Sequence, residues 1–388
     1  MIFYASKSSV LLLCFIIIAP YNVECTTYEC EVVEKYDNQG QTFCVFRDVQ
    51  YTANTTDIVF KTPKVVPARV VFENSQIEHL PKEFLNKFGA DLKVLNVTSC
   101  NLTTVVVTKS MEQLIATDNY IDKIIVHQTA QNSPMKELHL PSNRLADISN
   151  ITRHCKHLRI LDLSRNQMLA KNSELDFSVF NGLDQLEYLS LADVGAFYIL
   201  SDKKVSLPSL TLLDLSVNNL ISVDLHVDYF QSFKNLEVLR LNSNGFNQLD
   251  YNDLTGLESL KQVYLEGNEF SCSYLKTMIK HLNDNGKQTP VARPAAQCPV
   301  GYNIEHQMCC RSESLTSLPD RTKPSKPPTS DHNEHVTVTQ PSAVTAGSIT
   351  TKKTQPVDAL DKNSATCFVL NLRFAMWSLV IGLFWSKK

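Results

Sequence analysis

The sequence predicts an α/β solenoid, a single long array of short coils with a parallel sheet along one wall. Two observations predict it. An eleven-residue frame recurs nine times between Pro67 and Phe270, at starts 19 to 28 residues apart. The apolar spacing inside that frame fits neither a helix repeat of 3.6 nor a strand repeat of 2 for long, as expected of a chain that turns within every copy.

The frame is clearest in "LRILDLSRNQM", from Leu158 to Met168, where apolar residues fill the first, fourth, sixth and eleventh places and Asn fills the ninth. This pattern resembles the leucine-rich repeat, and nine registered copies make the match specific. The resemblance implies a horseshoe of about nine repeats. The other copies begin at Pro67, Leu92, Met111, Met135, Leu186, Leu210, Leu236 and Leu260.

Each place in the frame has a physical role. Leu161 and Leu163, at the fourth and sixth places, point inward from a short strand, and the first and eleventh places turn inward on the flanking bends. One coil buries too little apolar surface to offset the entropy of ordering its backbone, so neighbouring coils must stack. An Asn at the ninth place can satisfy buried turn amides. The Asn residues expected to do so are Asn143, Asn166, Asn218, Asn244 and Asn268.

Some copies depart from the frame. Cys100 replaces Asn in the second repeat, Ala116 is small for a sixth place in the third, and Val194 and Ala196 break the pattern in the sixth. We expect a less regular curve near these three coils.

The ends of the chain predict export. Residues 1–25 carry Lys7 and then a short apolar core, as a secretory signal peptide does. Residues 26–66 are expected to form an N-terminal cap, residues 67–271 the repeats and residues 272–311 a C-terminal cysteine cap. Residues 312–366, rich in Ser, Thr and Pro, predict a flexible stalk.

Residues 367–388 predict a hydrophobic anchor, and two readings stay open. The segment is short for a membrane span and carries Arg373, which is costly inside a bilayer, whereas the terminal Lys387 favours a span. Small residues from Asn363 to Ala365 favour a lipid-anchor signal instead. Either reading attaches the protein to the cell surface.

Eleven cysteines fit an oxidising compartment. Cys30 and Cys44 flank a turn sequence and are expected to staple a hairpin. The repeats hold Cys100 and Cys155, expected to be buried free thiols.

Four cysteines belong to the C-terminal cap, which resembles the cap that follows leucine-rich repeats: Cys272, Cys298, Cys309 and Cys310. They allow three pairings, and the sequence does not choose among them. Adjacent cysteines rarely bond to each other, so one of the last two could reach a second chain and give a disulfide-linked dimer. A zinc site using His306 with Cys298, Cys309 and Cys310 is the alternative.

Four Asn-x-Thr sequons predict a glycoprotein: Asn54, Asn96, Asn101 and Asn150. Asn96 holds a fifth place, which points out of the sheet. A glycan there would cover the N-terminal concave face and leave coils five to nine for partners.

No motif of an enzyme, metal site or cofactor site is found, and no cofactor is expected. His154 and His157 beside Cys155 could suggest a metal pair, but the outer bend of a solenoid is the better reading. Asp162 and Asp214 could stand near 10 Å apart for acid–base work, since strands lie about 4.8 Å apart, but a solvated face is favoured. A net charge of −3 does not indicate a nucleic-acid binder.

The outward third and fifth places pave the concave sheet and predict the binding surface. Ile160, Tyr188, Leu212 and Val238 form a column of exposed apolar groups over four coils, and Asp162, Asp214, Arg240 and Tyr264 lie beside them. Such a patch is typical of interaction sites, where Tyr and Arg are common hot spots.

The order of signal peptide, cystine cap, irregular repeats and a closing Cys309-Cys310 doublet resembles the leucine-rich immune proteins of mosquitoes, over about Tyr28 to Arg311. The resemblance implies extracellular innate immunity, with complement-like thioester proteins or another leucine-rich repeat chain as partners. The coiled coil of secreted members is absent after Arg311. We therefore expect a non-catalytic, surface-displayed recognition protein. The alternatives are an adhesion or developmental receptor ectodomain and, third, an extracellular enzyme inhibitor.

Overall fold

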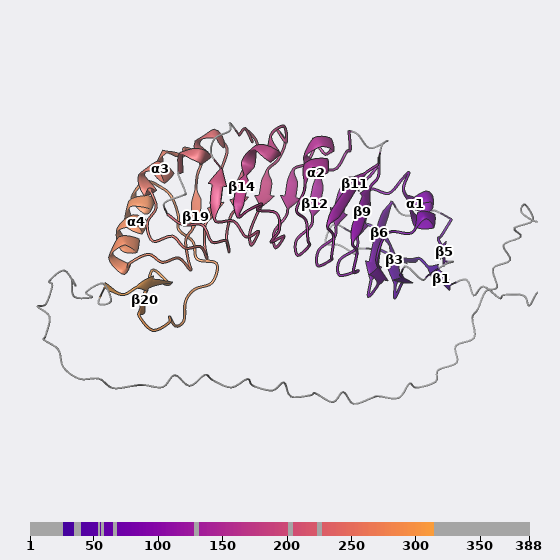
Figure 1. Ribbon diagram of the computed structural model, residues 1–388, viewed down its shortest axis with the longest axis horizontal. Helices are drawn as coiled ribbons and strands as arrows, with labels where there is room; N and C mark the ends of the chain where they lie inside the picture. Colours follow the sequence, from indigo (N-terminus) through magenta and orange to yellow (C-terminus); the bar gives the residue numbers. More distant parts are fainter. Residues whose placement is uncertain are drawn as a thin grey trace, which may run out of the picture.

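The computed structural model describes residues 26–34, 40–52, 55, 58–64, 68–127, 132–200, 205–222 and 227–313, with the side chains of residues 227 and 228 left out. The described chain forms an arch of stacked coils (Figure 1). Helices and short outer strands lie along its outer curve, and one long sheet lines the inner curve. The expected signal peptide and anchor, most of the expected stalk, and Asn54 lie outside the described residues.

The inner sheet has eleven strands and confirms the predicted solenoid. All neighbours are parallel except the first pair, β2 and β3, which are antiparallel. Each of the nine frames contributes one strand, short because only the third to fifth places, with two more in β6, stay extended. The strands are β2 (Glu31–Val33), β3 (Phe43–Arg47), β6 (Arg69–Glu73), β8 (Val94–Asn96), β10 (Gln113–Ile115), β12 (Glu137–His139), β13 (Ile160–Asp162), β15 (Tyr188–Ser190), β17 (Leu212–Asp214), β18 (Val238–Arg240) and β19 (Gln262–Tyr264).

The outer side of the arch varies from coil to coil. Some coils form one or two helical turns on this side, and others form short strands that pair in parallel. The helical segments are α1 (Lys82–Phe88), α2 (Ser149–His154), the 3-10 helices η2 (Phe177–Phe180) and η3 (Val227–Ser232), and α3 (Tyr251–Gly256). The strand pairs are β1 (Thr26–Glu29) with β5 (Ile58–Lys61), β4 (Gln50–Tyr51) with β7 (Gln76–Ile77), β9 (Thr104–Val107) with β11 (Lys123–Val126), and β14 (Glu174–Asp176) with β16 (Tyr198–Leu200).

The core between the two walls is one continuous cluster that runs from cap to cap. Leu161 and Leu163 are fully buried, as the frame predicts, and the first-place Leu158 is buried with them. The prediction for the eleventh place is wrong in one coil. Met168 is 64% exposed, whereas the eleventh residues of the other coils are buried.

The coil after Met168 lacks the ninth-place asparagine that most coils carry, although Ile77 stays buried before Cys100, which also replaces this asparagine. Each Asn accepts a hydrogen bond from the eleventh-place N–H of the preceding coil, as Asn166 does from Leu145 at 3.0 Å. Its Nδ2 also donates to Leu140 and Leu163, so one side chain joins two coils. The coil after Met168 carries Val194 at this place, which offers no acceptor. We call the row of asparagine side chains that join neighbouring coils the asparagine ladder. It is interrupted at Val194, and the chain turns early, with the N–H of Leu169 donating to Asn166 O at 2.9 Å.

The eighth place of every coil has a left-handed backbone, with φ between 49° and 73°. This turn brings the chain off the strand and aims the following Asn inward. Asn, Asp, Ser and Gly hold most of these places and tolerate the conformation. Arg165 and Val217 are the exceptions, and Val217, at φ 56°, is also β-branched.

The N-terminal cap extends the solenoid instead of merely covering it. The antiparallel β2–β3 hairpin is stapled by Cys30–Cys44, as predicted, and β3 then pairs in parallel with β6. Under it lies an aromatic cluster whose ring centroids are 4.7 to 6.2 Å apart, formed by Phe46, Phe60, Phe72, Phe84 and Phe88. Such ring pairs stabilise beyond their buried area.

The C-terminal cap is built on α4 (Cys272–Asp284), whose apolar face closes the open end of the core. Ser271 caps its first turn by accepting from the N–H of Tyr274, and the helix ends before Gly286, at φ 75°. A hairpin of β20 (Tyr302–Glu305) and β21 (Met308–Arg311) follows. Leu275, Met278, Ile279 and Leu282 are buried against the last coil.

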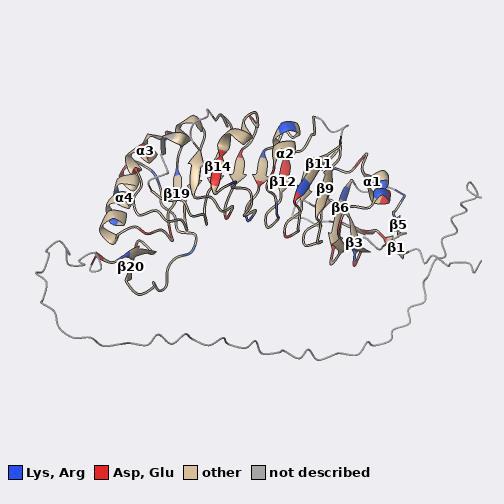
Figure 2. Ribbon diagram, in the orientation of Figure 1, with Lys and Arg blue, Asp and Glu red and all other residues tan. Residues whose placement is uncertain are grey.

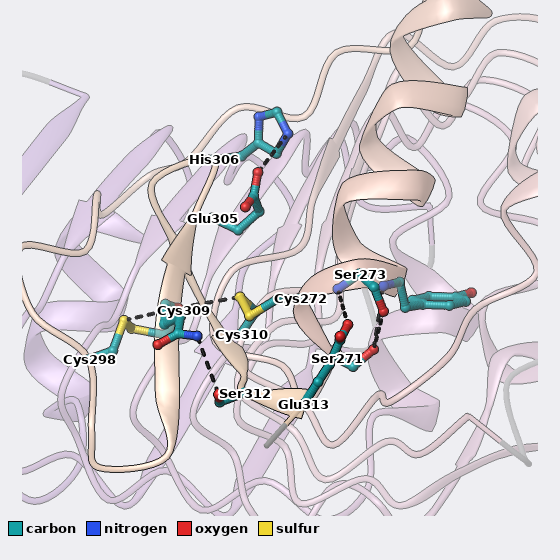
Figure 3. Close-up of a disulfide and its surroundings, with 12 residues drawn as sticks. Ser271, Cys272, Ser273, Cys298, Glu305, His306, Cys309, Cys310, Ser312 and Glu313 are labelled. Atoms are coloured by element: carbon teal, nitrogen blue, oxygen red, sulfur yellow. Dashed lines mark hydrogen bonds and ion pairs between the residues drawn. A yellow bond between two sulfur atoms is a disulfide. The ribbon is translucent and has the colours of Figure 1, made fainter. Parts of the chain in front are cut away.

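The cap cysteines form Cys272–Cys310 and Cys298–Cys309 (Figure 3). The first bond ties the hairpin to α4, and the second closes the base of the hairpin. Two sequence-based alternatives are therefore wrong. All four thiols are used within the chain, so neither Cys309 nor Cys310 can bridge to a second chain without breaking a bond. A zinc site with His306 would likewise have no thiolate to use.

Cys100 and Cys155 are buried free cysteines, as predicted. Burial raises the pKa of the Cys100 thiol to about 12 and that of the Cys155 thiol to about 11. Both thiols are therefore protonated and inert at neutral pH.

No helix among the described residues is both long enough and apolar enough to cross a bilayer.

Candidate functional site on the concave sheet

Strand pairing places the predicted binding residues in two straight rows across the concave face. In the first row Ile160 pairs with Tyr188, Tyr188 with Leu212, and Leu212 with Val238. In the second row, Asp214 pairs with Arg240 and Arg240 with Tyr264. Parallel, in-register pairing keeps equivalent side chains of neighbouring coils side by side. The eight residues thus form one surface, which we call the concave patch: Ile160, Asp162, Tyr188, Leu212, Asp214, Val238, Arg240 and Tyr264.

The apolar column of the concave patch is less open than the sequence suggests. Ile160, Tyr188, Leu212 and Val238 are each half-buried, because their neighbours on adjacent strands cover their sides. What remains open is the end of each side chain. A partner that covers the column therefore meets a continuous apolar strip with little side-chain freedom left to lose.

A polar chain of three residues runs beside the column. Arg240 Nη1 lies 3.1 Å from Asp214 Oδ2, and the Arg240 guanidinium lies 5.3 Å from the centroid of the Tyr264 ring. The other carboxylate oxygen of Asp214 accepts from the N–H and the hydroxyl of Ser216, at 2.9 and 2.6 Å. Arg240 is thereby held between a carboxylate and an aromatic face.

The expectation of a solvated pair of aspartates is wrong for Asp214. Its side chain is 9% exposed, and both of its oxygens already have partners. A carboxylate whose two oxygens are engaged in an ion pair and two hydrogen bonds has no free oxygen to act as a base. The geometry thus gives no acid–base pair with Asp162.

Tyr188 lies at the centre of the concave patch. Burial raises the pKa of its phenol, and the carboxylates of Asp162 and Asp214 raise it further. The phenol therefore stays protonated and can donate a hydrogen bond to a partner. A half-buried tyrosine at the centre of an apolar strip is a common interface anchor.

Asp162 and Asp214 share a local motif that sequence reasoning missed. A fifth-place Asp or Asn accepts from the N–H of the seventh-place Ser or Thr, at 3.0 Å for Asp162 and Ser164. Asn96 does the same with Thr98, at 3.1 Å from the N–H and 2.8 Å from the hydroxyl. The signal in the sequence is Asx-x-Ser/Thr at the end of a strand, and the motif fixes the side chain against the turn.

A polar group adjoins the patch on the N-terminal side. Glu137 accepts from Gln113 Nε2 at 2.7 Å, and its carboxylate lies 3.7 Å from His139 Nε2. Glu137 and His139 lie on β12, next to β13, and His139 pairs in register with Asp162. The carboxylates of Glu137 and Asp162 thus flank one end of the apolar column, and Arg240 flanks the other.

The concave face is closed at its N-terminal end. Phe43, Val45, Val71 and Val94 project from the sheet on this side and are buried together in a small apolar cluster separate from the main core. Val71 and Val94, which hold a fifth and a third place in the first two coils, are therefore not available to a partner. This gives a structural reason, independent of any glycan, for placing the binding surface farther along the arch.

The remaining predicted residues lie outside the patch. Asn101 and Asn150 are exposed, and Asn96 is half-buried on the concave sheet. Whether these asparagines carry glycans stays a prediction. Cys155 is buried between His154 and His157, and no group of three or more potential metal ligands occurs in the part of the chain that the structure describes.

Charges of both signs are distributed along the arch (Figure 2). Second-place residues pair across coils, with Glu112 between Lys93 and Lys136 at 3.3 and 2.9 Å, and Arg159 with Glu187 at 2.9 Å. Exposed pairs of this kind add little stability each. They do neutralise the edge of the sheet, which leaves the concave patch as the chemically distinctive surface.

Comparison with known proteins agrees with this fold. The family model "Leucine rich repeat" matches residues 208–270. Bovine Toll-like receptor 3 (Bos taurus) is 34% identical over 153 residues, which cover 36% of this chain and 16% of the receptor. The mouse transforming growth factor beta activator LRRC32 (Mus musculus) is 29% identical over 201 residues, which cover 42% of this chain and 28% of that protein.

Among solved structures, the LRIM1/APL1C complex is similar with a TM-score of 0.42 and 18% identity, over 74% of this chain and 72% of that chain. At this level the likeness concerns the fold alone. This chain spans less than a third of the length of the two curated relatives. The chain thus has a leucine-rich repeat fold with a disulfide-bonded cap at each end, and residues 208–270 match the leucine-rich repeat model.

Proposed function

We propose that this protein is a non-catalytic, extracellular recognition protein of innate immunity that binds a protein ligand on the concave patch. The observation that carries the proposal is the patch itself, an apolar strip four strands wide with Tyr188 at its centre and a fixed Arg240 at one end. Preorganised aromatic and Arg anchors around an apolar centre are the usual composition of a binding hot spot.

The surroundings of the patch support an extracellular setting. The disulfides at both ends of the arch form and persist in oxidising compartments. The predicted signal peptide and sequons agree, and the hydrophobic tail would hold the arch at the cell surface. The resemblance to mosquito immune proteins is the basis for the immune role, with a complement-like thioester protein or another leucine-rich repeat chain as the expected ligand.

The test is capture of a ligand from insect haemolymph by the immobilised, tagged protein, without reductant. We expect the wild type to retain a protein that Tyr188→Ala/Leu212→Ala loses by tenfold or more. The matched control is Ile125→Ala/Val179→Ala, which removes exposed apolar side chains from the outer side of the arch. Retention unchanged by the concave double variant contradicts the proposal.

The immune role has a separate test, because capture alone does not distinguish immunity from adhesion. We expect transcript and protein to rise in blood cells after bacterial challenge. Constant expression confined to developing tissue contradicts the immune role and favours an adhesion receptor.

A further inference from the structure

A second apolar surface lies on the flank of the arch, outside the concave patch. Met168, Phe197, Tyr198 and Ile221 are 64%, 41%, 45% and 41% exposed, and they come from three consecutive coils. We call these four residues the flank patch. Isolated exposed apolar residues are ordinary on a protein surface, but a contiguous group usually marks an interaction site.

The backbone places the four residues on adjoining coils. The rings of Phe197 and Tyr198 lie 6.4 Å apart. The next coil runs beside them, since the N–H of Asn219 donates to Ala196 O at 2.9 Å, which brings Ile221 to the place equivalent to Phe197. On the other side Gly195 lies against the backbone of Gln167, immediately before Met168.

Met168 lies where two coils are not joined by an asparagine side chain. In the neighbouring coils the eleventh-place N–H donates to a ninth-place Asn of the next coil, as the N–H of Ala196 does to Asn218 at 3.1 Å, whereas position 194 carries Val. Val194 offers no such acceptor, and Met168 lies on the surface. A change that costs a buried hydrogen bond and exposes a large apolar side chain has no stabilising role in the isolated arch.

The half of the arch that carries the flank patch is free of sequons. The last sequon is Asn150, and no Asn-x-Ser/Thr occurs between residues 151 and 313. Glycans are bulky and block contact between protein surfaces. The flank patch therefore stays accessible to another protein in the secretory pathway and at the cell surface.

The border of the flank patch carries both charge signs side by side. Lys171 and Glu174 are exposed and joined by a bridge in the backbone, and Glu174 pairs in register with Tyr198. A two-fold contact needs a surface that is complementary to itself, because each patch meets its own copy. An apolar centre with one cation and one anion at its edge meets that requirement, since Lys171 of each copy can face Glu174 of the other.

We propose that the flank patch is the dimer interface of this protein, and that its partner is a second copy of the same chain. The proposed contact is non-covalent, because the disulfides use all four cysteines of the C-terminal cap. Two copies on one membrane would then present two binding sites to a ligand.

The test uses two differently tagged full-length chains expressed in the same cells, with one tag captured from a detergent extract and the other measured. Wild-type chains are expected to capture each other. Phe197→Ser/Ile221→Asn is expected to lower capture at least tenfold, because two apolar anchors are lost. Ile125→Ser, an exposed apolar residue on β11, is the matched control and is expected to leave capture unchanged.

A charge exchange distinguishes a two-fold contact from non-specific hydrophobic association. Lys171→Glu and Glu174→Lys, each alone, put like charges opposite each other and should weaken capture, whereas the double variant should restore it. Failure of wild-type chains to capture each other, or equal capture by the wild type and Phe197→Ser/Ile221→Asn, overturns the proposal. Ligand binding by the concave patch is measured separately and does not depend on either result.

Discussion

The Asp214 carboxylate lies 3.1 Å from the Arg240 guanidinium, on the next strand of the concave sheet. Asp214 is almost fully covered, and Arg240 is more than one-third exposed. The buried carboxylate thus fixes the position of a guanidinium that still faces solvent. Recognition proteins use such a fixed cation because little side-chain entropy remains to be lost on binding.

This relationship predicts that loss of Arg240 lowers the stability more than loss of an exposed ion-pair partner on the same sheet. Arg240→Met leaves the buried carboxylate of Asp214 without its counter-ion, and we expect the free energy of unfolding to fall by about 1–3 kcal/mol. Lys261→Met removes an exposed partner of Glu237 in the same part of the sheet and should cost less than about 1 kcal/mol. Urea unfolding followed by circular dichroism measures both. Equal costs would show that Arg240 does not hold Asp214.

The adjacent residues Asn218 and Asn219 test the asparagine ladder. Asn218 is buried, accepts from the N–H groups of Val194 and Ala196 at 3.0 and 3.1 Å, and donates to Leu191 O and Leu215 O. Asn218→Ala leaves these groups without hydrogen-bond partners and should lower the free energy of unfolding by about 2–4 kcal/mol. Asn219 is exposed, so Asn219→Ala should change stability by about 0.5 kcal/mol or less. Similar unfolding midpoints for the two variants would contradict the ladder.

The left-handed backbone at the eighth places predicts one substitution that stabilises the protein and one that destabilises it. Val217 is strained at φ 56°, so Val217→Asn should stabilise the protein by about 0.5–1 kcal/mol. Gly267 has φ 73°, and a Cβ there would lie 3.0 Å from Ser243 Oγ. Gly267→Val should therefore destabilise by about 2 kcal/mol. Thermal melts of the two variants check this, and a lower melting temperature for Val217→Asn would be the contrary result.

The raised thiol pKa values predict both reactivity and pH dependence. At pH 8 iodoacetamide should leave Cys100 and Cys155 unmodified in the folded protein and label both in urea, as read by mass spectrometry. Burial raises the pKa of Cys100 from 9.0 to about 12, so only the unfolded state loses this proton above pH 9. The free energy of unfolding should therefore fall as the pH rises above about 9. Cys100→Ala/Cys155→Ala should remove most of that slope, and a slope unchanged in this variant would argue against the burial effect.

Much of the fold follows from the sequence, because the stacked frame repeats one physical requirement nine times. Leu161 and Leu163 must be inside, the ninth-place asparagines must join coils, and Cys30 must meet Cys44. The exposure of Met168 could not be read from its own frame, which is complete. Val194 holds the matching ninth place in the following coil, and relations between coils can be judged only once the stacking register is known.

The position of the candidate site was predictable from the sequence, but the burial and ion pairing of its charged residues were not. The register alone assigns the eight residues of the concave patch to one face, and the strand pairing agrees. The burial of Asp214 depends on Arg240 reaching back across one strand and on Ser216 in the turn, two side-chain choices that a pattern does not encode. The pairings of Cys309 and Cys310 likewise depend on where the hairpin docks against α4.

The central claim, that the concave patch meets a protein ligand, is tested most directly by site-specific photo-crosslinking. A photoreactive amino acid at position 212 reports on the patch, and the same group at position 280, on the exposed side of α4, is the control. After illumination with haemolymph, a discrete adduct at position 212 and none at position 280 is the predicted result. Adducts at position 280 with none at position 212 would contradict the account.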